Sequence, residues 1–201
     1  MQRLSRTVIR LNMATRSHHA EADAPWLDLM APGVSKDDYL QQLRRVYGFE
    51  APLEAAFRYT PGLAALVDLR SCTRSGLIAQ DLIRLGMSAS RLAELPQCFI
   101  TFSSQAEALG WMYVTERSTL LHAGVRRYLL QHVPDLADAT SYLSAYDGMT
   151  GQRWSELGSA LDAIPQAPAM TQHILHAANA GFRAMRRWFR NDDEPLRLVG
   201  T

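Results

Sequence analysis

The chain has 201 residues, of which 47% are hydrophobic and 20% charged, a composition typical of one soluble globular domain. The formal net charge of +1 gives no indication of nucleic-acid binding, and no apolar run approaches the roughly 18 residues that span a membrane. Two cysteines, Cys72 and Cys98, stand in no zinc or redox spacing, and no signal peptide is recognisable, so we expect a reduced, cytoplasmic protein.

Apolar residues recur at helical spacing along most of the chain, and strand-like alternation is nearly absent. We therefore predict an all-α, multi-helix protein. The expected helices, in chain order, cover about 5–23, 39–59, 63–69, 75–85, 103–133, 135–147, 152–164 and 171–190. These helices suit one compact domain over residues 1–190, and the polar residues 191–201 are expected to form a flexible tail.

Capping residues and helix breakers set these bounds. Ser35, with Asp38 three residues later, has the form of a helix N-cap. Pro25 is expected to end the first helix and Pro134 to close the long one. Gly86 is a good C-cap for the helix before it. The segment between this glycine and the long helix is predicted to be a connection.

The first predicted helix carries the most informative motif. It reads Leu11-x-x-Ala14-Thr15-x-x-x-His19, and it resembles the N-terminal helix of heme oxygenases, above all those found beside bacterial phytochromes. In that family the last histidine of the motif is the proximal ligand of the heme iron, so the resemblance implies this role for His19. His18 points about 100° away around the helix, so the two histidines cannot both serve one iron. The alternative for His19 is a partly exposed histidine that hydrogen-bonds to a neighbour.

Further short matches to this family follow in order along nearly the whole chain. They fall within the segments 39–54, 81–86, 108–116, 151–154 and 178–188. Each match alone is weak, but together they are specific for the heme oxygenase-like fold.

The segment after Glu116 departs from the family. Relatives usually read Gly-Ser-x-Leu-Gly-Gly there, whereas this chain reads Arg117-Ser118-Thr119-Leu120-Leu121-His122. Ser118 and Leu120 match, but all three glycines are replaced. In the family those glycines let the distal helix bend and lie against the heme face, leaving space for dioxygen. A side chain in their place occupies the volume that the ligand needs.

The resemblance implies a set of site residues. Glu116 and Ser118 are the candidate catalytic residues of the distal segment. Arg16, Arg117 and Arg153 are candidate cations for the two heme propionates, although relatives often place more basic residues in the helix that Arg153 begins. Two alternatives stand beside these roles: Glu116 could instead be paired with an arginine or a backbone group, and Arg117 could fill the pocket or reach solvent.

Other histidines offer different chemistries. His122 replaces a distal glycine and could coordinate iron opposite His19, giving a bis-histidine heme that binds but does not activate oxygen. The alternative is a histidine that fills an empty pocket or lies at the surface. His173 and His176, spaced i and i+3, share one helix side. Some relatives of this fold hold a di-iron site, but the further inward carboxylates that it needs are not evident here.

The resemblance therefore implies oxidative cleavage of heme to biliverdin, carbon monoxide and ferrous iron, with electrons from an external reductase. The competing hypothesis is a catalytically inactive protein of the same fold that binds heme, another tetrapyrrole or other ligand, or a protein partner. The missing glycines favour the second hypothesis, and the motif around His19 favours the first. A homodimer and a phytochrome partner both stay open.

Overall fold

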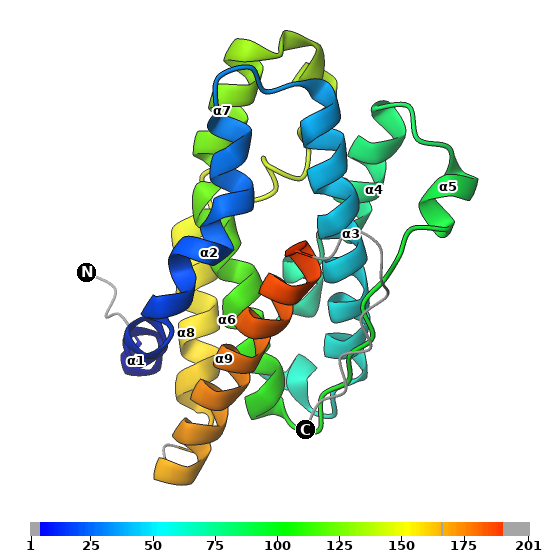
Figure 1. The fold of residues 1–201 in the computed structure, drawn as a ribbon. Coiled ribbons are helices and arrows are strands. Elements are labelled where there is room, and N and C mark those ends of the chain that lie inside the picture. Colours follow the sequence, from blue (N-terminus) through cyan, green and yellow to red (C-terminus); the bar gives the residue numbers. More distant parts are fainter. Residues whose placement is uncertain (1–4, 166, 191–201) are drawn as a thin grey trace.

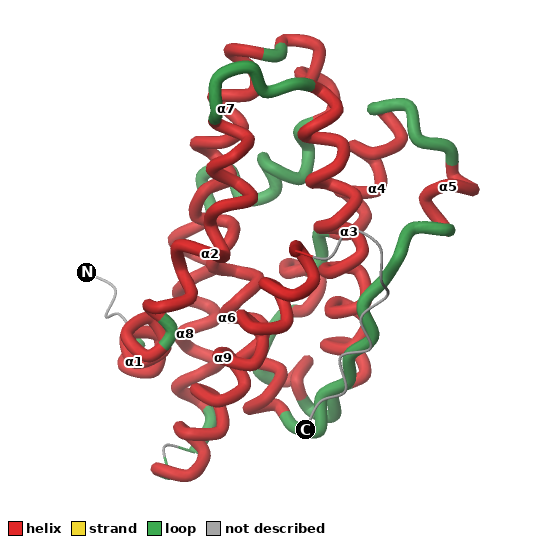
Figure 2. The backbone as a smooth tube through the Cα atoms, viewed as in Figure 1, coloured by secondary structure: helices red, strands yellow, loops and turns green. Residues whose placement is uncertain are grey.

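A computed structural model describes residues 5–165 and 167–190 of the chain. The predicted all-α architecture is confirmed: Figure 1 and Figure 2 show helices joined by short loops around a central helix. The helices are α1 (Arg6–Ala14), α2 (Arg16–Leu27), α3 (Lys36–Tyr59), α4 (Ser75–Arg84), α5 (Ala89–Ala93), α6 (Gln105–Ser118), α7 (His122–His132), α8 (Thr150–Ala163) and α9 (Pro168–Arg190). Short 3₁₀ turns connect several of them, namely η1 (Asp28–Met30), η2 (Leu63–Ala65), η3 (Leu69–Cys72), η4 (Thr119–Leu121) and η5 (Pro134–Ala139).

The N-terminal segment is two helices, not the single helix predicted to end near Pro25. The break falls at Thr15, whose hydroxyl donates a hydrogen bond to the Leu11 carbonyl at 2.7 Å. Such back-bonding by a threonine competes with the helical pattern and bends helices. Pro25 lies inside α2 instead of ending it, because one proline removes only one backbone hydrogen bond. His19 thereby comes to lie in the first turn of a helix that starts anew at Arg16.

The predicted long helix over 103–133 is also interrupted, at the segment that follows Glu116. It divides into α6, the turn η4 and α7. Ser118 Oγ donates to the Thr115 carbonyl at 2.7 Å, and Thr119 Oγ1 donates to the Glu116 carbonyl at 2.6 Å. Hydroxyl groups bonded back to their own helix compete with the helical pattern, and they accompany the change from α-helix to the turn η4.

Three shorter segments also differ from the predicted structure. The predicted short helix over 63–69 is the pair of turns η2 and η3, and the connection over 87–102 contains α5. The segment 135–147 holds η5 and further turns in place of a helix. The capping box of Ser35 and Asp38 is confirmed at the start of α3. The tail predicted for 191–201 lies outside the described residues.

Helix α6 is the central element, and most of its residues are buried. Its most extensive contact is with α9, which crosses in front of it in Figure 1. Gly110 makes the close approach between them possible: a Cβ atom there would lie 2.7 Å from the Ile174 carbonyl oxygen and 2.8 Å from the Ala177 Cβ. Within the described residues, no helix is long and apolar enough to span a membrane.

The variant Gly110→Ala is therefore expected to lower the free energy of unfolding by about 1–3 kcal/mol, because helix backbones must shift to admit one methyl group. Gly124→Ala is the matched control. Gly124 is also helical, and a Cβ there meets nothing within 4 Å, so alanine should stabilise the protein by about 0.5–1 kcal/mol. Urea unfolding of the two variants measures both effects, and equal stabilities would contradict the packing argument.

Candidate functional site

His19 lies half-buried in the first turn of α2. Its ring packs against Phe182 of α9, with 5.8 Å between ring centroids, and its Nε2 lies 3.1 Å from Thr15 Oγ1. Burial, followed by the nearby positive charge of Arg117, lowers the pKa of the imidazole. The neutral form is the one that ligates metals. His18 also packs against Phe182, with 5.6 Å between ring centroids, and its Nε2 lies 3.0 Å from Asn179 Oδ1.

An ion pair closes the space beside His19. Arg117 donates both guanidinium arms to Asp23, with its Nη2 2.9 Å from Asp23 Oδ2. Asp23 stands one turn after His19 on the same helix, and Arg117 belongs to α6, so the pair ties α2 to α6. The two side chains are only 18% and 14% exposed. Arg117 thus lies between the two helices rather than reaching solvent.

Little free volume is left deeper between these helices. A cavity of about 10 Å³ lies where Trp26 and Pro25 of α2 meet Ser118 of α6 and Phe189 of α9. Pockets that hold small organic ligands measure roughly 300–1,000 Å³. The Ser118 hydroxyl, a predicted catalytic group, is buried and bonded to its own helix. This cavity is too small for a ring system of the size of heme.

His122 is buried, in surroundings that differ from those of His19. Its ring centroid is 5.0 Å from that of Trp26 and 4.7 Å from that of Tyr142. Its Nε2 is buried without a hydrogen-bond partner. Burial, followed by the positive charge of Arg74, lowers the pKa of this imidazole well below its usual value. The ring packs as a neutral aromatic group, as in the pocket-filling alternative.

His122 should make the protein sensitive to acid. The unfolded chain binds a proton at this residue below about pH 6.5, whereas the folded state does not, so stability falls as the pH drops below that value. Between pH 7.5 and 5.5 this histidine should cost the wild type about 1.4 kcal/mol of unfolding free energy. In His122→Phe that loss is absent. The control variant His173→Phe replaces an exposed histidine and should lose as much unfolding free energy as the wild type. Chemical denaturation of the wild type and both variants at the two pH values measures these losses.

Glu116 is paired with an arginine, as the alternative interpretation of the sequence predicts. Its Oε1 accepts hydrogen bonds from Arg74 Nη1 at 3.3 Å and from the Tyr146 hydroxyl at 3.0 Å. Arg74 also donates through Nε to Glu50 Oε2 at 3.2 Å, and Glu50 Oε1 accepts from the Tyr142 hydroxyl at 2.7 Å. This group of one guanidinium, two carboxyls and two phenols is buried and is called the Arg74 cluster below.

The Arg74 cluster contains two carboxyl groups but one guanidinium. Burial raises the pKa of both Glu50 and Glu116, although Arg74 opposes the shift. Burial would lower the pKa of Arg74, but the two carboxyls raise it well above its usual value. The guanidinium also lies over the Tyr146 ring, 5.2 Å from its centroid. The cluster holds α3, α6 and the start of α4 together, and it is a structural feature rather than part of the gap at His19.

Other predicted site residues lie apart from this gap. Arg16 is exposed on α2. Arg153 is buried and pairs with Glu156, one turn further along α8. His173 and His176 are both exposed on α9. Among the residues that the structure describes, no group of three or more histidine, cysteine, aspartate or glutamate side chains is arranged to hold a metal ion.

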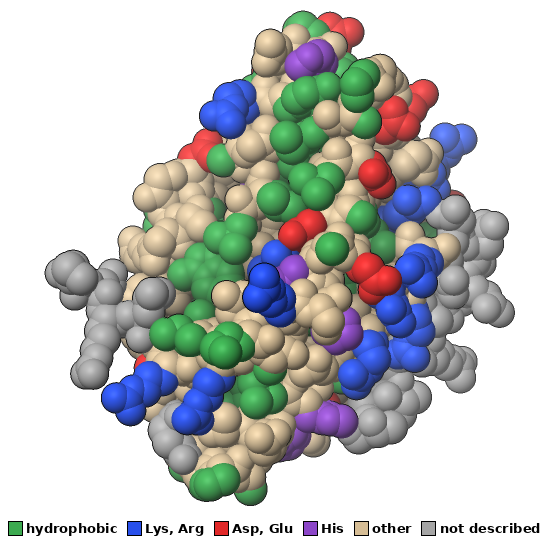
Figure 3. Space-filling model, turned by 60° about the vertical axis from the view of Figure 1, so that its left-hand side comes forward, with side chains coloured by type: hydrophobic (Ala, Val, Ile, Leu, Met, Phe, Trp, Pro, Cys, Tyr) green, Lys and Arg blue, Asp and Glu red, His purple; other side chains and the backbone are tan. Residues whose placement is uncertain are grey.

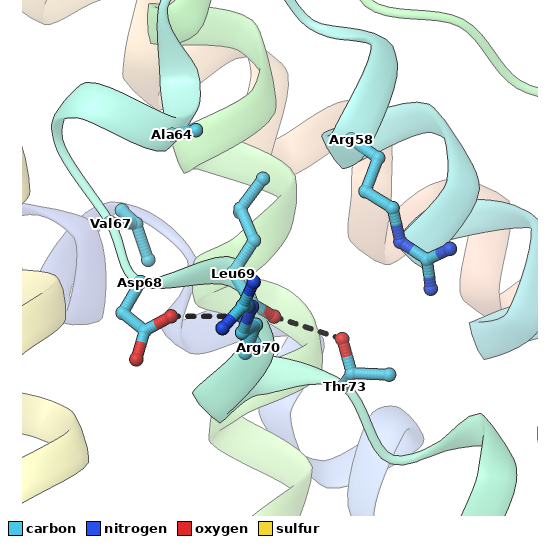
Figure 4. A pocket seen from close by; sticks show the side chains of 7 residues that line it. All are labelled: Arg58, Ala64, Val67, Asp68, Leu69, Arg70 and Thr73. Atoms are coloured by element: carbon cyan, nitrogen blue, oxygen red, sulfur yellow. Dashed lines mark hydrogen bonds between the residues drawn. The ribbon is translucent and has the colours of Figure 1, made fainter.

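A separate open hollow of about 640 Å³ lies between the end of α3 and the turns η2 and η3. Figure 4 shows its lining residues, in which Asp68 accepts a hydrogen bond from the Arg70 backbone and Thr73 donates to the Leu69 carbonyl. These bonds stabilise the local turn. None of the residues predicted from the sequence lines this hollow.

The comparisons with known proteins agree with the fold. The family model described as heme oxygenase matches residues 5–191. A solved structure, the NO- and CO-bound heme oxygenase from Neisseria meningitidis, is similar with a TM-score of 0.72 and 20% sequence identity, covering 94% of this chain and 92% of that one. Comparison with curated proteins gives no match.

Proposed function

The chain belongs to the heme oxygenase family, and from that premise we propose that it is a binding protein of this fold that does not cleave heme. The observation that carries the proposal is the ion pair between Arg117 and Asp23. It stands beside His19, where a heme oxygenase needs an open face between its two heme-binding helices.

Residues around His19 do not fit heme in the arrangement described above. Where the resemblance predicts the first distal glycine, this chain has Arg117, which is already bonded to Asp23 of α2. Trp26 is buried on the same helix. Two propionates need cations, but Arg153 is already paired with Glu156. Opening the gap would break the bidentate ion pair and leave Asp23 without this partner. The free energy of the broken ion pair would be subtracted from the free energy of heme binding.

One observation favours a second candidate, oxidative heme cleavage. His19 keeps its place in the motif, its imidazole is partly exposed, and its lowered pKa favours the neutral form. In that case the chain's own task would be to hold heme through His19 and to exclude water from the distal side, while heme supplies the oxygen chemistry. An external reductase as a partner belongs only to this candidate.

A heme titration of the purified protein tests the proposal. We expect no saturable one-to-one Soret band, and no biliverdin absorbance after ascorbate is added in air. A band that saturates and then decays to biliverdin would refute the proposal and establish the second candidate. A stable band without turnover would show that the gap opens for heme while the chain still fails to cleave it.

A further inference from the structure

A cleft of about 480 Å³ lies between α1, α8 and the turn η4. This volume is within the roughly 300–1,000 Å³ of pockets that bind small molecules. Val8, Leu120 and Trp154 supply apolar surface to its lining, and Asp162 supplies a carboxylate. Figure 3 views the molecule from the side on which α1 lies and shows apolar side chains gathered on this face. Neither His19 nor Arg117 lines the cleft.

Hydrogen bonds fix the two helices that form the cleft. Asp162 Oδ1 accepts from Ser5 Oγ at 2.8 Å and from Thr7 Oγ1 at 3.0 Å, which ties the start of α1 to the end of α8. Gly158 allows this approach, since a Cβ atom there would lie 2.9 Å from the Ser5 Cβ. The cleft is therefore held open by the packing of α1 on α8 and is not a gap between loops.

The charge of the cleft is one-sided. Asp162 is the one charged side chain among the described residues that line it, and no arginine, lysine or histidine accompanies it. A ligand with two carboxylates, such as a porphyrin with its propionates, would find no cation among these lining residues and would meet the negative charge of Asp162. A positively charged group suits Asp162, because charge-assisted hydrogen bonds to carboxylates are among the strong ones. The Trp154 ring is also attractive to cations.

We propose that this cleft binds a small organic cation that carries an apolar ring, a ligand of the arylalkylamine class. The ammonium group would meet Asp162, and the ring would lie against Leu120, Val8 and Trp154. The inference rests on the proposed function in one respect: it describes a protein that binds a small molecule rather than one that cleaves heme.

Two probes with the same ring test the inference. Tryptamine is a cation at neutral pH, and indole-3-acetate is an anion. Each is titrated into ¹⁵N-labelled protein while the indole N–H resonance of Trp154 is followed, assigned with Trp154→Phe. We expect a saturable shift with tryptamine and at least about tenfold weaker binding of indole-3-acetate, which corresponds to about 1.4 kcal/mol.

Matched variants locate the site. Gly151 lines the cleft in the first turn of α8, and a Cβ atom there meets nothing within 4 Å. Gly151→Leu should fill the cleft and weaken tryptamine binding at least tenfold. Gly76→Leu is the control, because Gly76 is also exposed in a first helical turn with open space around it. Asp162→Asn keeps an acceptor for Ser5 and Thr7, and it should remove most of the preference for the cation.

Each outcome bears on the inference. No saturable shift with tryptamine, equal binding of the two probes, or unchanged binding in Gly151→Leu would overturn it. A heme titration of the same preparation separates it from the proposed function. If the protein cleaves heme and does not bind tryptamine, both the proposed function and this inference are wrong. If it neither cleaves heme nor binds tryptamine, the proposed function stands and only the ligand class is wrong.

Discussion

Arg74→Met is expected to lower the free energy of unfolding by about 3–5 kcal/mol, the usual cost of removing one partner from a buried ion pair. The guanidinium is bonded to both Glu50 and Glu116, and all three side chains are at least 93% buried. Without it, two buried carboxyls keep only the phenol hydroxyls of Tyr142 and Tyr146 among these partners. Methionine preserves much of the apolar volume, so the loss is one of charge and hydrogen bonds rather than of packing.

Two further measurements identify the cause of the lower unfolding free energy of Arg74→Met. Carboxyl groups with a raised pKa bind protons more tightly in the folded state, so the deficit of Arg74→Met should shrink as the pH falls toward 5. Adding Glu50→Gln and Glu116→Gln should recover part of the loss. Arg127→Met, at an exposed position of α7, should change stability by less than about 0.5 kcal/mol. A deficit that is independent of pH and of the two carboxyls would assign the loss to packing.

Placing three glycines in the distal segment, with Arg117→Gly, Leu121→Gly and His122→Gly, is expected to raise the affinity for heme above that of the wild type. The change removes the arginine that closes the gap at His19 and the imidazole that packs on Trp26. A one-to-one Soret band with at least tenfold higher affinity than the wild type is the expected result. His19→Ala in the same background should abolish the band, because the new binding depends on that imidazole.

The triple variant carries a stability cost of up to about 1 kcal/mol for each helical glycine, plus the lost packing of His122. Circular dichroism therefore accompanies the titration, and the single variant Arg117→Gly is measured beside it because it removes the ion pair alone. Arg127→Gly is the control for a glycine placed elsewhere after α6. Folded variants that still give no saturable band would mean that side chains at these positions are not what closes the gap.

The sequence predicts the helices well and the breaks between them less well. Ser35 with Asp38, and Gly86, mark helix ends through local chemistry that is visible in a few residues. The break at Thr15 and the turn η4 arise instead from hydroxyl groups that bond back to the Leu11, Thr115 and Glu116 carbonyls. Serine and threonine take this role in only some of their helical positions, so the pattern of apolar residues does not reveal it.

The sequence also predicts the candidate site only in part. The motif is enough to predict that His19 lies on an early helix, and side chains at 117, 121 and 122, where the resemblance predicts glycines, are enough to predict a filled gap. That Arg117 pairs with Asp23 depends on two helices 94 residues apart in the chain, which no local spacing shows. The sequence offered an arginine as one possible partner of Glu116, but it did not identify Arg74 or the other members of the Arg74 cluster. Its one signal is the inward helical position of Glu50 and Glu116, since buried acids require a buried cation.

The contact between α2 and the last helix, α9, also governs when the protein can finish folding on the ribosome. Helix α2 meets α9 through His18 and Asn179 and through Glu21 with Arg186, and α6 lies against the same helix. The N-terminal helices leave the exit tunnel first but find this partner only after the final helix has been synthesised. At about 5–20 residues per second, α9 is completed roughly 8 to 33 seconds after α2 and about 4 to 14 seconds after α6. A nascent chain stalled before α9 is therefore the form most exposed to chaperones and proteases.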